Sequence, residues 1–214
     1  ETYKMIHDLQ PQALIINNHH VAPYPGEDVQ PFEQDLPGEN DAGFNTTFVS
    51  NEMPLEMAQT MNGSWGFNLV DDRFKSTKEL ISALVGAAGR NSNYLMNTGP
   101  MPDGQIQAEN IKTFHEMGEW LKIYGESIYG TRGGPIGPRP WGVTTNKDKT
   151  IYIHILDWKD GEIFIPLTDI KIGDATLLGK DEKILYEMTD DGVIFKIDRE
   201  ALQNWDMIIK VNLL

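Results

Sequence analysis

The chain has 214 residues and a formal net charge of −14, with 40% hydrophobic and 23% charged residues, a composition typical of a globular protein. The acidic balance excludes nucleic acid as the expected partner, because such a surface repels phosphates. The sequence contains no cysteine, which excludes disulfides, thiolate metal sites and cysteine nucleophiles. No apolar run approaches the roughly 18 residues of a membrane span.

The first elements are separated by a long polar segment. Apolar residues on one face predict a helix over 2–10, which Pro11 ends. The continuous apolar run at 13–17 predicts a strand that is buried on both faces. Residues 18–52 follow, and loops of this length in a compact domain are usually functional or disordered. A second short strand is expected over 55–61.

Three well-marked elements come next. Ser76 is a favourable N-cap for a helix over 77–89, and Glu79 completes a capping box. A strand is expected over 93–97, and apolar residues at helical spacing predict a helix over 108–124. This alternation of strands and helices favours an α/β layer or barrel with parallel strands.

The character of the sequence changes after about residue 133. Residues 133–140 (GGPIGPRP) read as a Gly/Pro linker, and alternating apolar segments separated by turn signals follow it. This pattern predicts an antiparallel β module of the sandwich type. We place the boundary near residue 138, with one domain over 1–138 and the other over 139–214.

The histidines offer one candidate site. Residues 17–20 read NNHH and directly follow the expected strand at 13–17, so their side chains should lie at its C-terminal rim. Adjacent histidines can serve a binding site or simply make loop hydrogen bonds, and both readings stay open. A metal site is not expected, because ligands on neighbouring residues tend to point apart. His7, His115 and His154 are expected to be helix or strand residues without a role.

The acidic segment 26–40 (GEDVQPFEQDLPGEN) offers a second candidate, although its charges could simply be solvated. Glu33 stands out because Phe32 precedes it. A neighbouring aromatic ring lowers local polarity and favours the protonated carboxyl group that a general acid needs. Trp65, near glycines in MNGSWG, is either a core residue or a platform on which a sugar ring stacks. Together these features suggest a carbohydrate-active barrel.

Three ordered strings carry a family resemblance: PLEMAQTMNGSWGFN, LISALVGAAGRNSNYLMNTGPMPDG and MGEWLKIYGESIYGTRGGP. They resemble the family-29 glycoside hydrolases, the α-L-fucosidases, over roughly residues 1–135, and the following β module is similar to that family's C-terminal sandwich. The resemblance implies the C-terminal part of a (β/α)₈-like catalytic barrel over 1–138 and an antiparallel β-sandwich over 139–214. It also implies a retaining exo-α-L-fucosidase that removes terminal fucose from fucosylated oligosaccharides or glycoconjugates by a two-carboxylate double displacement.

The resemblance also assigns acidic residues. GEDVQPFE (26–33) is similar to the family's acid/base loop and puts that role on Glu33, with Glu27 and Glu39 as open alternatives. Glu56 matches another recurring acid of the family, and we assign it to structural hydrogen bonding. The chemistry implies neither a cofactor nor a metal.

Other residues are placed at the sugar. Trp65 matches an aromatic residue that lines the fucose pocket of the family. His19 stands where family members often carry an arginine that contacts fucose, and we expect His19 and His20 to bind substrate. Residues 97–99 are expected to end a barrel strand near the rim and to be mainly architectural.

One part of the family pattern is missing. The family nucleophile is an aspartate in a strand that ends like W-F-D-G, and this string does not occur in the sequence. We therefore expect the nucleophile and the N-terminal half of the barrel upstream, in the same chain or in a partner chain. The alternative is a non-catalytic carbohydrate-binding protein or an inactive fragment of such a barrel. The resemblance also implies a periplasmic or secreted location.

Overall fold

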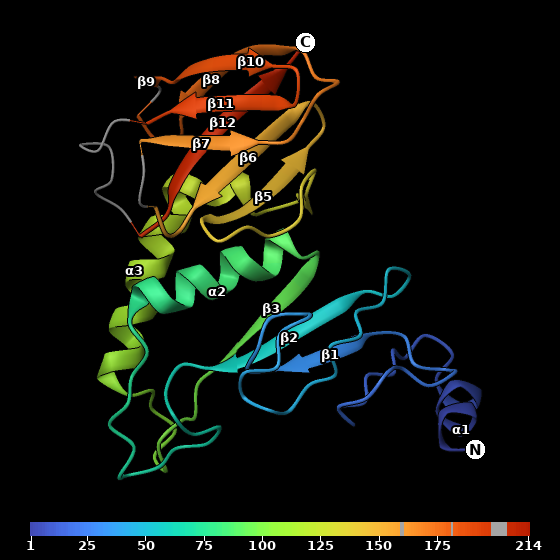
Figure 1. Ribbon diagram of the computed structural model, residues 1–214. Coiled ribbons are helices and arrows are strands. Elements are labelled where there is room, and N and C mark those ends of the chain that lie inside the picture. Colours follow the sequence, from blue (N-terminus) through green and yellow to red (C-terminus); the bar gives the residue numbers. More distant parts are fainter. Residues whose placement is uncertain (159–160, 181, 198–204) are drawn as a thin grey trace. The chain divides into compact units, whose positions relative to one another are not determined.

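The structure is a computed structural model that describes residues 1–158, 161–180, 182–197 and 205–214 (Figure 1). Its contacts divide the chain into two compact units. The first comprises residues 1–75 and 91–110, and the second comprises residues 76–90 and 111–214. The domain boundary near residue 138 stays a prediction. No helix in the described part of the chain has the length and apolar character that crossing a membrane requires.

The first unit is built around a three-stranded parallel sheet in the order β1-β2-β3. Its elements are α1 (Thr2–Leu9), β1 (Gln30–Glu33), β2 (Leu55–Thr60) and β3 (Ser92–Asn97). Neighbouring residues of a strand point to opposite faces of the sheet. One face of β1 and β2 therefore buries Phe32, Leu55 and Met57 in a core, while the other face carries Glu33 and Glu56. Within the described residues, the sheet does not close into a barrel.

The local sequence signals locate most of this unit. The helix predicted over 2–10 and the strands predicted over 55–61 and 93–97 are confirmed, with ends that differ by one residue. The strand β1 lies inside the segment that the sequence predicts as a long loop. Pro31 argues against a strand in the sequence, because within sheets proline is found in edge strands and bulges. The structure agrees with that restriction, since β1 is an edge strand of this sheet.

The strand predicted over 13–17 is wrong. Within this run only Ile16 forms an isolated bridge, to Val29. The run is not buried on both faces, because the side chains of Leu14 and Ile16 are 75% and 45% exposed. A continuous apolar run forms a buried strand only where other elements pack on both of its faces. The sequence of the run does not show whether such elements are present.

The second unit begins with α2 (Thr77–Gly89), which is confirmed to the residue. Ser76 caps it as predicted: its Oγ accepts from the backbone N–H of Glu79 at 3.2 Å, and its own N–H donates to the Glu79 carboxylate at 2.7 Å. At the other end, Gly89 lies so close to β5 (Gly142–Lys147) that an added Cβ would stand 2.4 Å from Val143. α3 (Ala108–Tyr124) also has the predicted bounds.

We expect Ser76→Ala to lower the free energy of unfolding by about 1 kcal/mol, because the first turn of α2 loses its side-chain acceptor. Ser76→Asn should cost much less, since asparagine caps a helix about as well as serine. Urea unfolding of both variants checks this. An equal loss in the two variants would contradict the capping role.

Two antiparallel sheets make up the rest of the second unit (Figure 1). One has six strands in the order β4-β5-β6-β12-β8-β9, and the other has three in the order β10-β11-β7. The remaining bounds are β4 (Arg132–Gly133), β6 (Thr150–Ile155), β7 (Glu162–Ile165), β8 (Ile172–Leu177), β9 (Glu182–Lys183), β10 (Leu185–Thr189), β11 (Gly192–Lys196) and β12 (Met207–Leu213). The antiparallel pairing that the alternating pattern predicts is confirmed.

One hydrophobic core joins the two antiparallel sheets. It contains Ile153 of β6 and Ile209 of β12 from the larger sheet, and Ile165 of β7 and Phe195 of β11 from the smaller one. The segment predicted as a linker over 133–140 contributes Ile136 to the same core. That segment is therefore packed, and Gly133 within it already pairs in β4.

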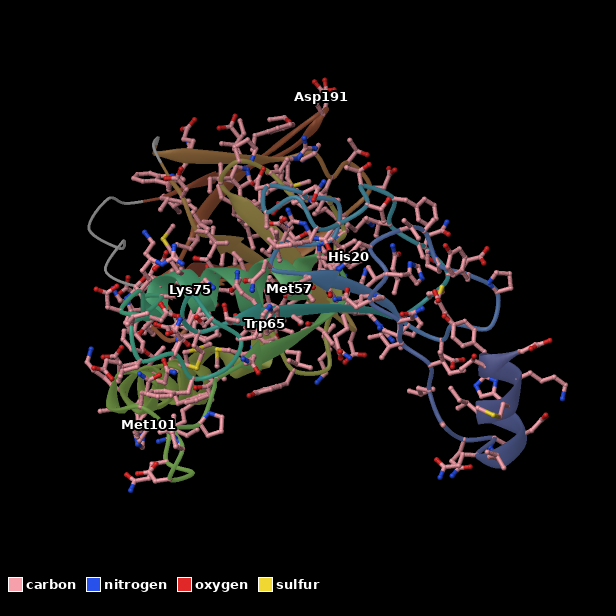
Figure 2. All side chains as sticks on the ribbon, turned by 90° about the horizontal axis from the view of Figure 1, so that it is seen from below. His20, Met57, Trp65, Lys75, Met101 and Asp191 are labelled. Carbon is pink, nitrogen blue, oxygen red and sulfur yellow. The ribbon has the colours of Figure 1, made fainter. Side chains whose placement is uncertain are left out.

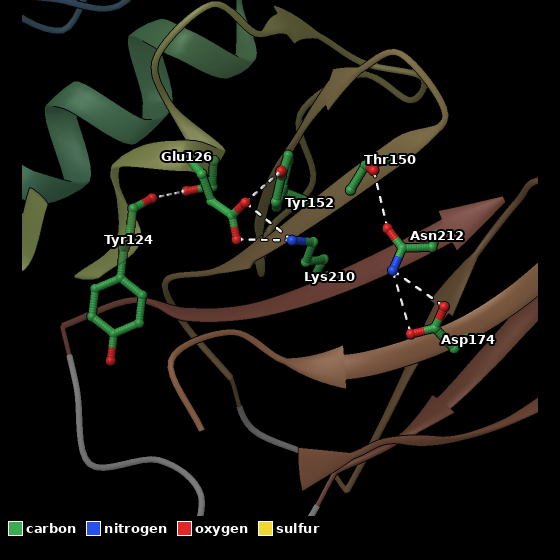
Figure 3. A network of polar contacts seen from close by, with 8 residues as sticks. Tyr124, Glu126, Thr150, Tyr152, Asp174, Lys210 and Asn212 are labelled. Carbon is green, nitrogen blue, oxygen red and sulfur yellow. Dashed lines mark hydrogen bonds and ion pairs between the residues drawn. The ribbon is translucent and has the colours of Figure 1, made fainter. Parts of the chain in front are cut away.

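Polar contacts cross the strands of the larger sheet (Figure 3). Asn212 of β12 accepts a hydrogen bond from Thr150 of β6 at 3.0 Å and donates to Asp174 of β8 at 3.2 Å. On the same strand, Lys210 pairs with Glu126 of the 3₁₀ helix Gly125–Ser127 at 3.0 Å. These contacts support the register of β12 against both of its neighbours.

A chain of buried polar groups also runs through the second unit. His154 of β6 places Nδ1 2.6 Å from Asp206 Oδ2 and Nε2 3.2 Å from Thr145 Oγ1. The Thr145 hydroxyl donates to the Ser127 carbonyl at 2.7 Å, so its oxygen accepts from His154. Nε2 of His154 is therefore the donor to Thr145, and Nδ1 is hydrogen-bonded to Asp206. The side chains of His154 and Asp206 are 0% exposed.

Candidate functional site

The polar face of β1 and β2 borders a pocket of about 430 Å³ in the first unit. Glu33 is the last residue of β1. Glu56, the second residue of β2, lies on the same face of the sheet. The residues that line the pocket are Ile16, Asn18, Pro31, Phe32, Glu33, Glu56, Ala58 and Trp65. The pocket thus combines carboxylates, an amide and a large aromatic ring. In the described part of the chain, no group of His, Cys, Asp or Glu side chains is arranged to hold a metal ion.

The carboxylate of Glu33 is held from two sides. Asn18 Nδ2 donates to its Oε2 at 2.6 Å, and Trp65 Nε1 donates to its Oε1 at 3.1 Å. His20 Nε2 lies 3.7 Å from Oε2, and Figure 2 labels both His20 and Trp65. The backbone of Glu33 is fixed by Asn45, whose amide accepts from its N–H and donates to its C=O at 2.8 Å. The carboxylate keeps a defined orientation while its side chain stays 17% exposed.

The aromatic neighbour of this carboxylate is Trp65 rather than Phe32. The side chain of Phe32 is 1% exposed and packs in the core on the other face of β1. Trp65 is 41% exposed while its indole N–H contacts Glu33. A ring that is bound at one edge and open to solvent can stack on the C–H face of a sugar.

Glu27, the first alternative for the acid/base, lies in a different environment. Its carboxylate accepts from Tyr3 Oη at 2.6 Å, from His19 Nε2 at 2.9 Å and from the backbone N–H of Tyr24 at 2.9 Å, and its side chain is 1% exposed. Burial on its own raises the pKa of Glu27, but the hydrogen bonds from Tyr3, His19 and Tyr24 together hold that pKa below its usual value. A carboxyl group held in its ionised form is a poor general acid.

The structure brings only some of the predicted site residues together. Glu33, His20 and Trp65 converge, whereas His19 turns toward Glu27 and its ring stacks on Tyr24 with centroids 4.6 Å apart. Glu39, the second alternative acid/base, does not line this pocket. Glu56 does line it, and its structural hydrogen bonding stays a prediction.

The sequence did not predict the part that Asn18 plays in this pocket. Asn18 donates to Glu33 across 15 positions of the chain, and nothing in the local pattern signals that contact. The available signal was its place in the NNHH string, which already marked this rim. The string marked this segment, but its pattern gives no sign that Asn18 contacts Glu33.

The turn after β3 holds the loop that carries Trp65. Asn97 Nδ2 donates to the carbonyl oxygen of Trp65 at 2.5 Å. Gly99 packs against the backbone of the same loop, and an added Cβ would stand 2.3 Å from the nitrogen of Phe67. A side chain at Gly99 would displace this backbone, so the NTG string fixes the position of Trp65.

We expect Gly99→Ala to lower the free energy of unfolding by about 1–3 kcal/mol, the usual cost of overpacking. The loop at 64–68 must move away, so the fluorescence of Trp65 should also shift to that of a more solvated indole. Urea unfolding and emission spectra check this, with Gly137→Ala as the control, because Gly137 has neither close neighbours nor a positive φ. An unshifted spectrum at full stability would contradict the close packing.

Comparisons with known proteins agree with one another. The family described as alpha-L-fucosidase matches residues 1–126. The chain is 28% identical over 146 residues to the plasma alpha-L-fucosidase of Homo sapiens, which covers 63% of this chain and 31% of that protein. It is 33% identical over 99 residues to the tissue alpha-L-fucosidase of Mus musculus, which covers 45% of this chain and 20% of that protein.

Solved structures show the same likeness. Alpha-L-fucosidase isoenzyme 1 from Paenibacillus thiaminolyticus superposes with a TM-score of 0.81 at 28% identity, over 99% of this chain and 52% of that one. An alpha-L-fucosidase from Bacteroides thetaiotaomicron gives a TM-score of 0.80 at 20% identity, over 99% of this chain and 51% of that one, and so supports the fold. The chain spans less than a third of the length of these two curated relatives and about half of the length of these structures.

Proposed function

The chain belongs to the α-L-fucosidase family, and from that premise we propose that the protein is a retaining exo-α-L-fucosidase. Its substrates are terminal α-linked L-fucose residues of oligosaccharides or glycoconjugates. The observation that carries the proposal is the position of Glu33, which ends β1 in a pocket and is held by Asn18 and Trp65. The C-terminal ends of parallel strands are where enzymes of the barrel type keep their catalytic residues.

Glu33 serves as the acid/base in this proposal. As the acid it gives a proton to the glycosidic oxygen while the bond to fucose breaks, and as the base it later takes a proton from the attacking water. Trp65 offers its open face to the sugar, and Asn18 and His20 set the direction in which the Glu33 carboxyl points. The other acidic candidates fit less well, because Glu27 is held in its ionised form away from the pocket lining.

A retaining mechanism also needs a nucleophile, with the two carboxyl groups about 5–5.5 Å apart. We propose an aspartate outside these 214 residues for that role, because the sequence contains no W-F-D-G string. The parallel strands β1–β3 then form part of a (β/α)₈-like barrel, and the two antiparallel sheets with their shared core form a β-sandwich. The name of the human relative, a plasma enzyme, supports a secreted or periplasmic location.

Release of free fucose tests the proposal. The complete protein is incubated with an unactivated α-L-fucosyl oligosaccharide, and the products are separated and quantified. We expect fucose as the released sugar, and stronger inhibition by a fucose-shaped iminosugar than by a galactose-shaped one. Absence of release, or stronger inhibition by the galactose-shaped compound, would contradict the proposal.

The second candidate is a non-catalytic carbohydrate-binding protein. The missing W-F-D-G string favours it, together with a pocket in which an exposed Trp65 can stack on a sugar. Titration calorimetry with a fucosylated oligosaccharide separates the two candidates. Binding of the intact oligosaccharide without any release of fucose would favour this second candidate over hydrolysis.

A further inference from the structure

The NNHH segment, residues 17–20, presents alternate side chains to two different partners. Asn18 and His20 approach Glu33, at 2.6 Å and 3.7 Å from its Oε2. The other two side chains, those of Asn17 and His19, bond elsewhere in the first unit. The segment is therefore held from one side while it presents two polar groups to the carboxyl group that we assign as acid/base.

The holding side is a cluster that we call the anchor cluster, formed by Tyr3, Asn17, His19 and Glu27. Asn17 Nδ2 donates to Tyr3 Oη at 2.7 Å, and Tyr3 Oη donates to Glu27 at 2.6 Å. His19 completes it, with Nε2 lying 2.9 Å and 3.0 Å from the two oxygens of Glu27. The cluster thus joins α1, the NNHH segment and the start of the acidic loop.

The protonation of His19 follows from its two contacts. The backbone N–H of Val21 donates to Nδ1 at 3.3 Å, so that nitrogen is an acceptor. Nε2 therefore carries the proton that it donates to Glu27. With both nitrogens engaged, one face stacked on Tyr24 and a side chain only 17% exposed, His19 has no ring atom left for a sugar hydroxyl.

We propose that the anchor cluster positions Asn18 and His20 against Glu33, and that His19 is a positioning residue rather than a substrate ligand. The inference rests on the proposed function, because it concerns the orientation of the acid/base. Loss of the anchor lets residues 17–20 shift, so the Glu33 carboxyl loses its fixed direction. Misplacement of a catalytic group by about 1 Å can cost on the order of 100-fold in rate.

The test compares His19→Ala, Glu27→Ala and the double variant in the complete protein, each with two substrates. One is an unactivated fucoside, which needs the acid, and the other is an activated aryl fucoside, which needs it little. We expect each single variant to lower kcat/KM, which reports the step that breaks the glycosidic bond, by about 10- to 100-fold on the unactivated fucoside and far less on the aryl fucoside. The double variant should be no worse than either single one, because both break the same contact.

Milder and control variants keep the result clear. Tyr3→Phe removes one hydroxyl and should show the same selective loss to a smaller degree, while His115→Ala changes an exposed histidine of α3 and should change nothing. If His19→Ala raises KM for both substrates while Glu27→Ala leaves the kinetics unchanged, His19 binds the sugar directly. That result would overturn the inference. Equal losses on both substrates together with a lower Tm would show a merely structural role and also overturn it.

The failure of this inference is separable from failure of the proposed function. Glu33→Gln is assayed beside the other variants with the same two substrates. If Glu33→Gln leaves the ratio of the two rates unchanged, the proposed acid/base is wrong. If Glu33→Gln lowers the rate on the unactivated fucoside relative to the aryl fucoside, while His19→Ala and Tyr3→Phe leave this ratio unchanged, Glu33 is the acid/base. The positioning role of the anchor cluster is then wrong.

Discussion

Glu33→Gln is expected to lower kcat on an unactivated fucoside by about 10²- to 10⁴-fold, the usual contribution of a general acid/base. The amide has the size of the carboxyl group but gives no proton to the leaving oxygen. An aryl fucoside with a good leaving group should lose much less in the step that breaks the glycosidic bond. The values of kcat/KM for both substrates, which report that step, measure the difference.

Glu39→Gln is the matched control for this variant, since Glu39 belongs to the same acidic segment but does not line the pocket. We expect it to retain turnover within a few fold. If Glu39→Gln instead shows the selective loss and Glu33→Gln keeps full turnover on the unactivated fucoside, the roles of the two residues are reversed. The pocket around Trp65 would then not be the catalytic site.

Asp206→Ala is expected to lower the free energy of unfolding by about 1–3 kcal/mol, as is usual when a buried polar group loses its hydrogen-bond partner. Asp206 and His154 are both fully buried, and both ring nitrogens of His154 are engaged in hydrogen bonds. The variant therefore leaves the buried Nδ1 of His154 without its partner, which costs free energy because no water replaces the lost contact. Urea unfolding, followed by the loss of β structure, measures the change.

Asp191→Ala provides the comparison. Asp191 is exposed in the turn between β10 and β11 (Figure 2), so its removal should change the free energy of unfolding by no more than about 0.5 kcal/mol. A loss of similar size in both variants would mean that net charge, rather than the buried pair, governs stability. Such a result would contradict the stabilising role of the buried His154–Asp206 hydrogen bond.

Local signals made much of the fold predictable. Ser76 and Glu79 are three positions apart and form their capping box within one turn, so the bounds of α2 could be read from the sequence. The strand predicted over 13–17 failed for the opposite reason. Whether its apolar run forms a buried strand depends on the elements that pack against Leu14 and Ile16, which are exposed in the structure. A single sequence does not show that packing.

The site was predictable in its segments but not in its contacts. The acidic loop and SWGF string led to Glu33 and Trp65, yet the two residues are 32 positions apart and their hydrogen bond has no local signal. The same limit explains His19, which was expected at the sugar. Its direction is decided by Glu27, and only the fold shows that adjacent histidines point to different partners.

The most direct measurement of the central claim is azide rescue of Glu33→Ala in the complete protein, with an activated aryl fucoside as substrate. In a retaining enzyme without its acid/base, an activated substrate still forms the fucosyl-enzyme, but water then hydrolyses this intermediate slowly. Azide can attack the intermediate from the side where the carboxylate stood. We expect faster turnover with azide and an α-configured fucosyl azide as the product, identified by NMR. Turnover that azide does not change, or a β-configured azide, would contradict the assignment of Glu33 as the acid/base.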